Sequence, residues 1–140
     1  MPILKIIAGG VIAGILANAT GYLITGRLFH PYQAKTPNTW RQAESWTHYQ
    51  YATAIRIAAC VGIGLFYAAF AASLASFGAG AIPRGVSFGA LLWGVTILPL
   101  VLEVALFVNW HRGFVMGLVV DWLVVCVLAS VAAAVAVGAV

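Results

Sequence analysis

The sequence predicts an all-α integral membrane protein, a single domain (residues 1–140) folded as a bundle of four transmembrane helices. Hydrophobic residues make up 64% of the chain and charged residues only 7%, whereas a soluble domain carries roughly 25% charged residues. In addition, four apolar runs each reach the length of about 20 residues that a helix needs to cross a bilayer. Because so few charges cannot cover a water-facing surface, we expect lipid to surround much of the molecule.

The predicted helices cover residues 3–25, 53–77, 85–108 and 113–137. These runs are continuous and lack an alternation of period two, which favours helices over the strands of a membrane barrel. Pro83 and the glycine-rich residues 78–80 are expected to end the second helix. The length of 140 residues suits one domain, and the sequence contains no internal repeat.

The first run also fits the pattern of a secretory signal peptide. Lys5 precedes an apolar stretch, and Ala17-Asn18-Ala19 has the small residues of a cleavage site. The apolar run then resumes as far as Ile24, which a cleaved signal does not require. We therefore favour an uncleaved first helix.

The connection between the first two helices, residues 26–52, is the extended polar segment of the chain. Within it, Thr39 and Gln42 have the spacing of a capping box, which predicts a helix start. Aromatic residues of the kind that favour the headgroup level follow; they are Trp40, Trp46, Tyr49 and Tyr51. We expect a short interfacial helix between helices 1 and 2, or an extension of the second helix.

The net charge of +4 does not indicate nucleic-acid binding, because seven basic residues scattered through apolar sequence form no basic patch. In a membrane protein, Lys and Arg instead mark the cytoplasmic side. The first and third connections carry Arg27, Lys35, Arg41 and Arg112, and the opposite side carries Lys5 and Arg84. This bias predicts that both termini lie outside and that the 26–52 connection is cytoplasmic.

Ionisable residues inside the predicted spans are the strongest functional signal. A charge at the bilayer centre costs on the order of 2.5–3.5 kcal/mol, so such residues face the protein interior, an aqueous cavity or the interface. Helical spacing puts Arg56, Glu103 and Asp121 on stripes that can face the bundle. Asn18 and Tyr22 share the corresponding face of the first helix. We therefore predict a buried polar cluster of Asn18, Tyr22, Arg56, Glu103 and Asp121.

This cluster has more than one interpretation. Arg56 between Glu103 and Asp121 can form an ion-pair network that fixes helix packing. A protonatable acid beside an arginine can also line a polar pocket open to the cytoplasmic side, as a proton-coupled carrier requires. In a third arrangement the acids face lipid near the interface and snorkel outward. No motif specifies a reaction, so catalytic residues stay unknown.

The histidines lack metal-site spacing, because no two are four residues apart and no H-E-x-x-H occurs. We expect them at the membrane interface within a polar and aromatic set made up of His30, Trp40, Trp46, His48, Trp110 and His111. Cys60 and Cys126 lie in apolar segments without a close cysteine partner, so we expect small buried hydrophobic residues. We expect no metal and no cofactor.

Short motifs around the first and last helices carry a family resemblance. They are Gly21-Tyr22-Leu23, Leu28-Phe29, the following Trp40, and the tight turn before the last helix. In outline, over its whole length, the chain resembles an uncharacterised domain family of small four-helix bacterial inner-membrane proteins. The resemblance implies a four-helix fold and a bacterial inner-membrane location, and it implies no activity.

The sequence favours a non-enzymatic subunit or scaffold of a membrane complex. Stripes of small residues and the Ala/Val-rich residues 129–140 suit helix association. The partners are then the lipid bilayer and other membrane helices, in a homo-oligomer or a larger complex. One alternative is a small oligomeric proton-coupled carrier or channel that uses Glu103 or Asp121. A further alternative is a membrane redox protein that binds quinone or haem near the histidines.

Overall fold

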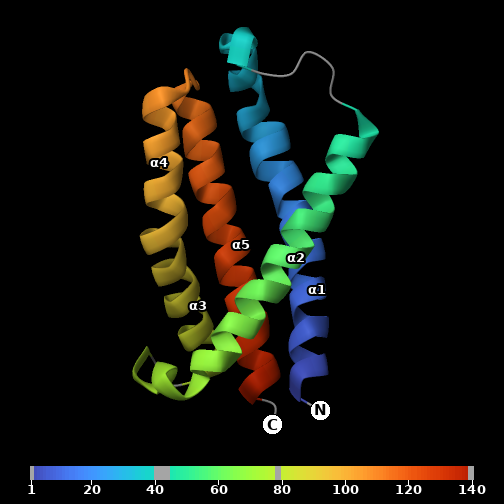
Figure 1. Ribbon diagram of the computed structural model, residues 1–140, viewed down its shortest axis with the longest axis vertical. Coiled ribbons are helices and arrows are strands. Elements are labelled where there is room, and N and C mark those ends of the chain that lie inside the picture. Colours follow the sequence, from blue (N-terminus) through green and yellow to red (C-terminus); the bar gives the residue numbers. More distant parts are fainter. Residues whose placement is uncertain (1, 40–44, 78–79, 139–140) are drawn as a thin grey trace.

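The computed structural model describes residues 2–39, 45–77 and 80–138, and within these ranges the protein is helical and contains no strand. Its elements are α1 (Pro2–Gly21), η1 (Tyr22–Phe29), η2 (His30–Lys35), η3 (Pro37–Thr39), α2 (Trp46–Phe70), η4 (Ala71–Phe77), α3 (Ala81–Leu92), η5 (Trp93–Ile97), α4 (Leu98–Phe107) and α5 (Arg112–Gly138). Several of these are continuous, so the described chain forms four long rods (Figure 1).

The four rods confirm the predicted helix number within the described residues. They are Ile3–Lys35, Trp46–Leu74, Ala81–Phe107 and Arg112–Gly138, and each is long and apolar enough to cross a membrane. The rods differ in burial: 44% of the most apolar stretch of α5 is buried, against 6% for the rod of α3 and α4. Figure 1 shows α5 between that rod and the crossed pair α1 and α2. The last helix is therefore the centre of the bundle.

Glycines allow the helices to approach closely, as small residues do at helix contacts. A methyl group at Gly14 of α1 would lie 2.7 Å from the Cα of Ile57 in α2. A methyl group at Gly89 of α3 would lie 2.7 Å from the Cα of Val127 in α5. The backbones thus touch where α1 meets α2 and where α3 meets α5, and these contacts fix how the rods cross.

The first rod is longer than predicted, because it continues to Lys35 instead of ending near residue 25. A π-helical segment, η1, follows Gly21, and π-helical turns are rare and often occur at functional sites. The extension packs on α5: a methyl group at Gly117 would lie 2.6 Å from Phe29, and one at Gly113 would lie 2.7 Å from Tyr32. This tertiary packing keeps residues 26–35 helical, although the sequence pattern assigned them to a connection.

The second rod begins at Trp46, seven residues before the predicted residue 53. The backbone N–H of Ser45 donates to Nδ1 of His48 (3.1 Å), which is one half of a capping box. This start agrees with the expectation of an extended second helix. The predicted interfacial helix falls largely on residues 40–44, which lie outside the described residues, as does Trp40; the three-residue η3 precedes them.

The third rod begins at Ala81, before Pro83, which was expected to mark the boundary. Proline is tolerated there because the first turn of a helix has no use for its missing N–H. A second proline, Pro99, follows the π-helical η5, where a regular α-helix would press its ring against the carbonyl of Val95. The indole N–H of Trp93 in η5 donates to the carbonyl of Val119 (2.9 Å), which ties this rod to α5.

Candidate functional site

An ion pair between Arg56 and Asp121 lies at the centre of the bundle. Nη1 of Arg56 lies 3.0 Å from Oδ1 of Asp121, and Nη2 lies 2.6 Å from Oδ2. Asp121 is fully buried, and the Arg56 side chain is 19% exposed. The guanidinium also donates to the carbonyl of Ala17 (2.9 Å), so one side chain joins α1, α2 and α5. The predicted pairing of Arg56 with Asp121 is confirmed.

Two neighbours of this pair were not predicted as part of the site. Any side chain at Gly21 would collide with Nη1 of Arg56 and would approach Oδ1 of Asp121 within 3.1 Å. Trp122 lies beside the guanidinium, with Cζ of Arg56 5.8 Å from the ring centroid, within the range of a cation–π contact. The adjacency of Trp122 to Asp121 in the sequence is the one signal that could have indicated it.

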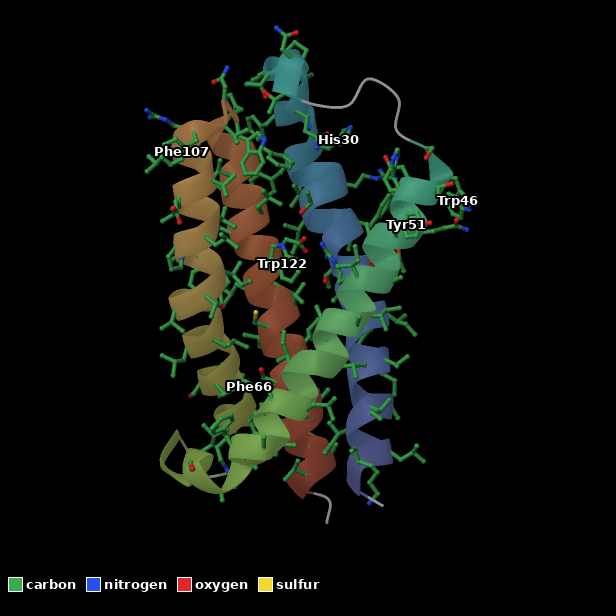
Figure 2. The ribbon with its side chains drawn as sticks, viewed as in Figure 1. His30, Trp46, Tyr51, Phe66, Phe107 and Trp122 are labelled. Atoms are coloured by element: carbon green, nitrogen blue, oxygen red, sulfur yellow. The ribbon has the colours of Figure 1, made fainter. Side chains whose placement is uncertain are left out.

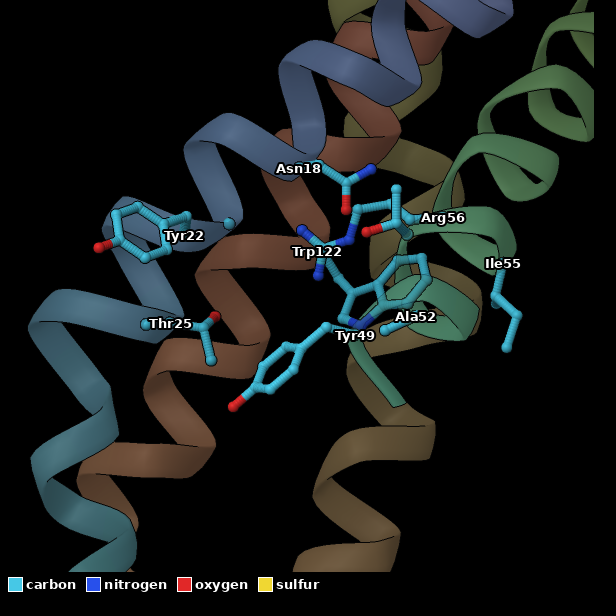
Figure 3. Close-up of a pocket in the computed structure, with 11 residues that line it drawn as sticks. Asn18, Tyr22, Thr25, Tyr49, Ala52, Ile55, Arg56 and Trp122 are labelled. Carbon is cyan, nitrogen blue, oxygen red and sulfur yellow. The ribbon is translucent and has the colours of Figure 1, made fainter. Parts of the chain in front are cut away.

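Asn18 and Tyr22 flank the pair without contacting it through hydrogen bonds. Nδ2 of Asn18 donates to the carbonyl of Gly14 (2.8 Å), within its own helix. Tyr22 is 60% exposed, and its hydroxyl accepts a hydrogen bond from Nε of Arg27 (3.2 Å). The prediction that Tyr22 is buried is therefore wrong: the π-helical segment that it begins turns its ring to the surface (Figure 3).

Glu103 does not belong to the cluster, which corrects the prediction of one arginine between two acids. It lies on the exposed face of α4, on the opposite side of α5 from α1 and α2 (Figure 1). It lines a surface groove of about 840 Å³ together with Arg112, Trp110 and Met116. Within the described residues, the ion pair with a carboxylate is that of Asp121 with Arg56, so Glu103 and Arg112 share a groove without pairing.

A groove between η1 and α2 opens beside the ion pair (Figure 3). Its inner part has a volume of about 590 Å³ and its outer part about 820 Å³. Both parts are lined by Tyr22, Gly26, Tyr49 and Thr53. Arg56, Asn18 and Trp122 lie at the inner end, and His30 and Trp46 at the outer end. We call this the η1–α2 groove.

The η1–α2 groove contains unused hydrogen-bond donors. A guanidinium has five N–H groups, and three of those of Arg56 make the contacts described above, which leaves two. Oγ1 of Thr25 also has no partner among the described residues, but it is fully buried and offers no donor to the groove. The charge of Arg56 is already balanced by Asp121, so the groove offers donors rather than net charge.

The described residues of the set predicted at the interface, which leaves out Trp40, lie toward one end of the bundle, as Figure 2 shows for His30 and Trp46. His48 caps α2, and His111 stacks on Tyr32 (4.8 Å between centroids) and accepts the N–H of Gly113 through Nδ1 (3.0 Å). Trp110 packs edge-on against Phe114 (5.9 Å). His48 and His111 thus serve local structure, and no group of three or more metal-binding side chains gathers in the described ranges.

Cys60 and Cys126 lie in the core and are free thiols. Their exposed fractions are 0% and 1%. The prediction of small buried hydrophobic residues is confirmed.

Comparison with protein families, with curated proteins and with solved structures finds no match to this chain.

Proposed function

We propose that this chain is a non-enzymatic, self-associating subunit of a membrane assembly, whose four rods cross a bacterial inner membrane. Glu103 is the observation that carries the proposal, because it lies on the exposed face of an apolar helix. An unpaired charge within a bilayer costs on the order of 2.5–3.5 kcal/mol. A donor on a neighbouring subunit relieves that cost, so the face of α4 that carries Glu103 serves as an interface.

In the proposed placement, the ends that carry Lys35 and Arg112 lie on the cytoplasmic side. Asp121 then lies about 13 Å deeper than Arg112 along α5, close to the middle of a hydrocarbon core about 30 Å thick. The start of α2 lies at the headgroup level, where Trp46 and Tyr51 are exposed and Trp46 lies at the outer edge of the molecule (Figure 2). A reporter that is active only in the cytoplasm should work after Lys35 and stay silent after Val140.

The occupant that we assign to the η1–α2 groove is α4 of a second copy. The groove has spare donors on Arg56, and α4 presents the acceptor oxygens of Glu103. Both features lie toward the same end of the bundle, so two copies at equal depth in a membrane can bring them together. Small residues on the groove walls, Gly26 and Ala54 among them, permit close helix approach.

This contact joins two different surfaces, so it propagates from copy to copy. Such heterologous contacts form a closed ring if the rotation between successive copies adds up to a full turn, and an open filament if it does not. A scaffold role follows from repeated assembly. The carrier hypothesis relied on Glu103 or Asp121 as a protonatable acid beside an arginine. Asp121 is fully buried and paired with both terminal nitrogens of Arg56, and Glu103 lies on the surface apart from that pair, so the scaffold is the function that we propose.

Disulfide cross-linking tests the assignment. In a Cys60→Ala, Cys126→Ala background, one tagged copy carries Leu106→Cys, one turn from Glu103 on α4, and a second carries Ala54→Cys in the groove. We expect a mixed dimer between the two. The control replaces Ala54→Cys with Leu23→Cys, which lies near the level of Tyr22 and is 58% exposed, outside the groove.

Equal cross-linking at Leu23→Cys would contradict the groove as the docking surface. Native mass spectrometry of gently solubilised membranes checks the composition of the assembly. A stable complex with a different protein, without a second copy of this chain, would overturn self-association.

A further inference from the structure

The end of the bundle where α1 begins and α5 ends contains a separate cavity (Figure 1). Its volume is about 480 Å³, and it lies between the end of α2, the first turn of α3 and the last turn of α5. Three lining residues carry the argument: Tyr67, Gly80 and Arg84. The remaining wall is made of small or apolar residues, including Ala71, Ala134 and Val137.

Tyr67 brings an unused polar group to this cavity. The residue is only 2% exposed, and its ring packs edge-on against Phe88 (5.3 Å between centroids). Its hydroxyl makes no hydrogen bond with any described residue. It is also not one of the fully buried side-chain atoms without a partner, which belong to Thr25, Thr36 and Ser130. The hydroxyl therefore opens to the cavity that Tyr67 lines, where it can donate to a ligand.

The opposite wall is positively polarised. Nε of Arg84 donates to the carbonyl of Gly80 (3.2 Å), which holds the guanidinium over the start of α3. The first turn of this helix contains no acidic residue, and the N–H groups of Ala81 and Ile82 have no intrahelical acceptor. A helix N-terminus carries a partial positive charge, so it repels Arg84. Among the described residues that line the cavity, none carries a carboxylate to balance them.

We propose that this cavity binds a phosphate group, and that the phosphodiester of a membrane phospholipid supplies it. Arg84 and the start of α3 bind the charged oxygens, and the Tyr67 hydroxyl donates one further hydrogen bond. In the proposed membrane placement the cavity lies at the headgroup level opposite the cytoplasmic face. The inference rests on that placement and is independent of self-association through Glu103.

Native mass spectrometry of the full chain tests this site. Detergent-solubilised protein is exchanged with phosphatidylglycerol, phosphatidylcholine or diacylglycerol, and the retained lipid is counted. We expect both phospholipids to be retained and diacylglycerol, which lacks phosphate, to be lost. Tyr67→Phe keeps the packed ring and removes only the hydroxyl, so it should lower retention about tenfold, as loss of a hydrogen bond to a charged group does. Arg84→Gln should lower it at least as much.

Matched controls are Tyr22→Phe and Arg27→Gln, which change an exposed tyrosine and an exposed arginine outside this cavity. If Tyr67→Phe retains lipid like the wild type, or if Arg27→Gln loses as much as Arg84→Gln, the site is refuted. A thermal shift with inorganic phosphate, at an ionic strength matched with chloride, separates the two sources of the same chemistry. Stabilisation by free phosphate that Tyr67→Phe abolishes, with no phospholipid retained, would reassign the cavity to a soluble phosphate.

Discussion

Two carboxylates on neighbouring rods have opposite surroundings. Asp121 is fully buried in the central helix α5, where Arg56 pairs with both of its oxygens. Glu103 lies exposed on α4, in the least buried of the four rods. The bundle buries Asp121 because Gly21 leaves room for its partner, Arg56. It leaves Glu103 on a surface that, in the proposed assembly, a second copy covers.

The largest effect should follow from breaking the Arg56–Asp121 pair. Removing one member of a buried pair typically costs about 3–5 kcal/mol, whereas replacing both with apolar residues is often neutral. Asp121→Leu leaves a guanidinium that keeps its charge, while Arg56→Met leaves an aspartate that can bind a proton. We therefore expect Asp121→Leu to lower the melting temperature in detergent most, Arg56→Met less, and the double variant least.

The double variant is the control for coupling. If it melts no higher than Asp121→Leu alone, the two residues act independently and the ion pair does not hold the helices together.

Gly14 should give the next largest effect, because it permits the contact of α1 and α2 that brings Ala17 and Arg56 together. Gly14→Leu forces the two backbones apart, and overpacking of this kind costs about 1–3 kcal/mol or more. Gly62→Leu is the matched control, since nothing lies within 4 Å of a methyl group at Gly62 on α2. Thermal unfolding should separate them, and similar melting temperatures would show that α1 and α2 do not need close contact.

The sequence was sufficient for the helix number and for the limits of the last helix, because long apolar runs in a chain with few charges admit few alternatives. It placed the first helix end ten residues early, because the packing of Phe29 and Tyr32 on Gly117 and Gly113 becomes visible only in three dimensions. It also started the third helix at residue 85, after Pro83, although the first turn of a helix tolerates proline and α3 begins at Ala81.

The candidate site was predictable only in part, because it too depends on how the helices pack in three dimensions. Helical spacing assigns a residue to a face, and this brought Arg56 and Asp121 together correctly. It does not specify which helix covers that face, and Glu103 lies exposed on α4, in a groove that it shares with residues of α5. The η1–α2 groove depends on the angle between two helices, which no local pattern encodes.

The smallest effect on the single chain, and the sharpest test of the comparison, should come from Glu103→Gln. Because Glu103 has no ion-pair partner within the described residues, this change should leave the melting temperature of the dilute monomer unchanged, in contrast to Asp121→Leu. Hydrogen bonds between membrane helices contribute about 0.6 kcal/mol on average and up to about 1.7. We therefore expect self-association, measured by fluorescence energy transfer between labelled copies in vesicles, to weaken about three- to twentyfold. Glu103→Asp shortens the side chain but keeps the charge, so it should weaken association less. A destabilised monomer with unchanged association would instead make Glu103 a structural residue, and the two carboxylates would no longer differ in kind.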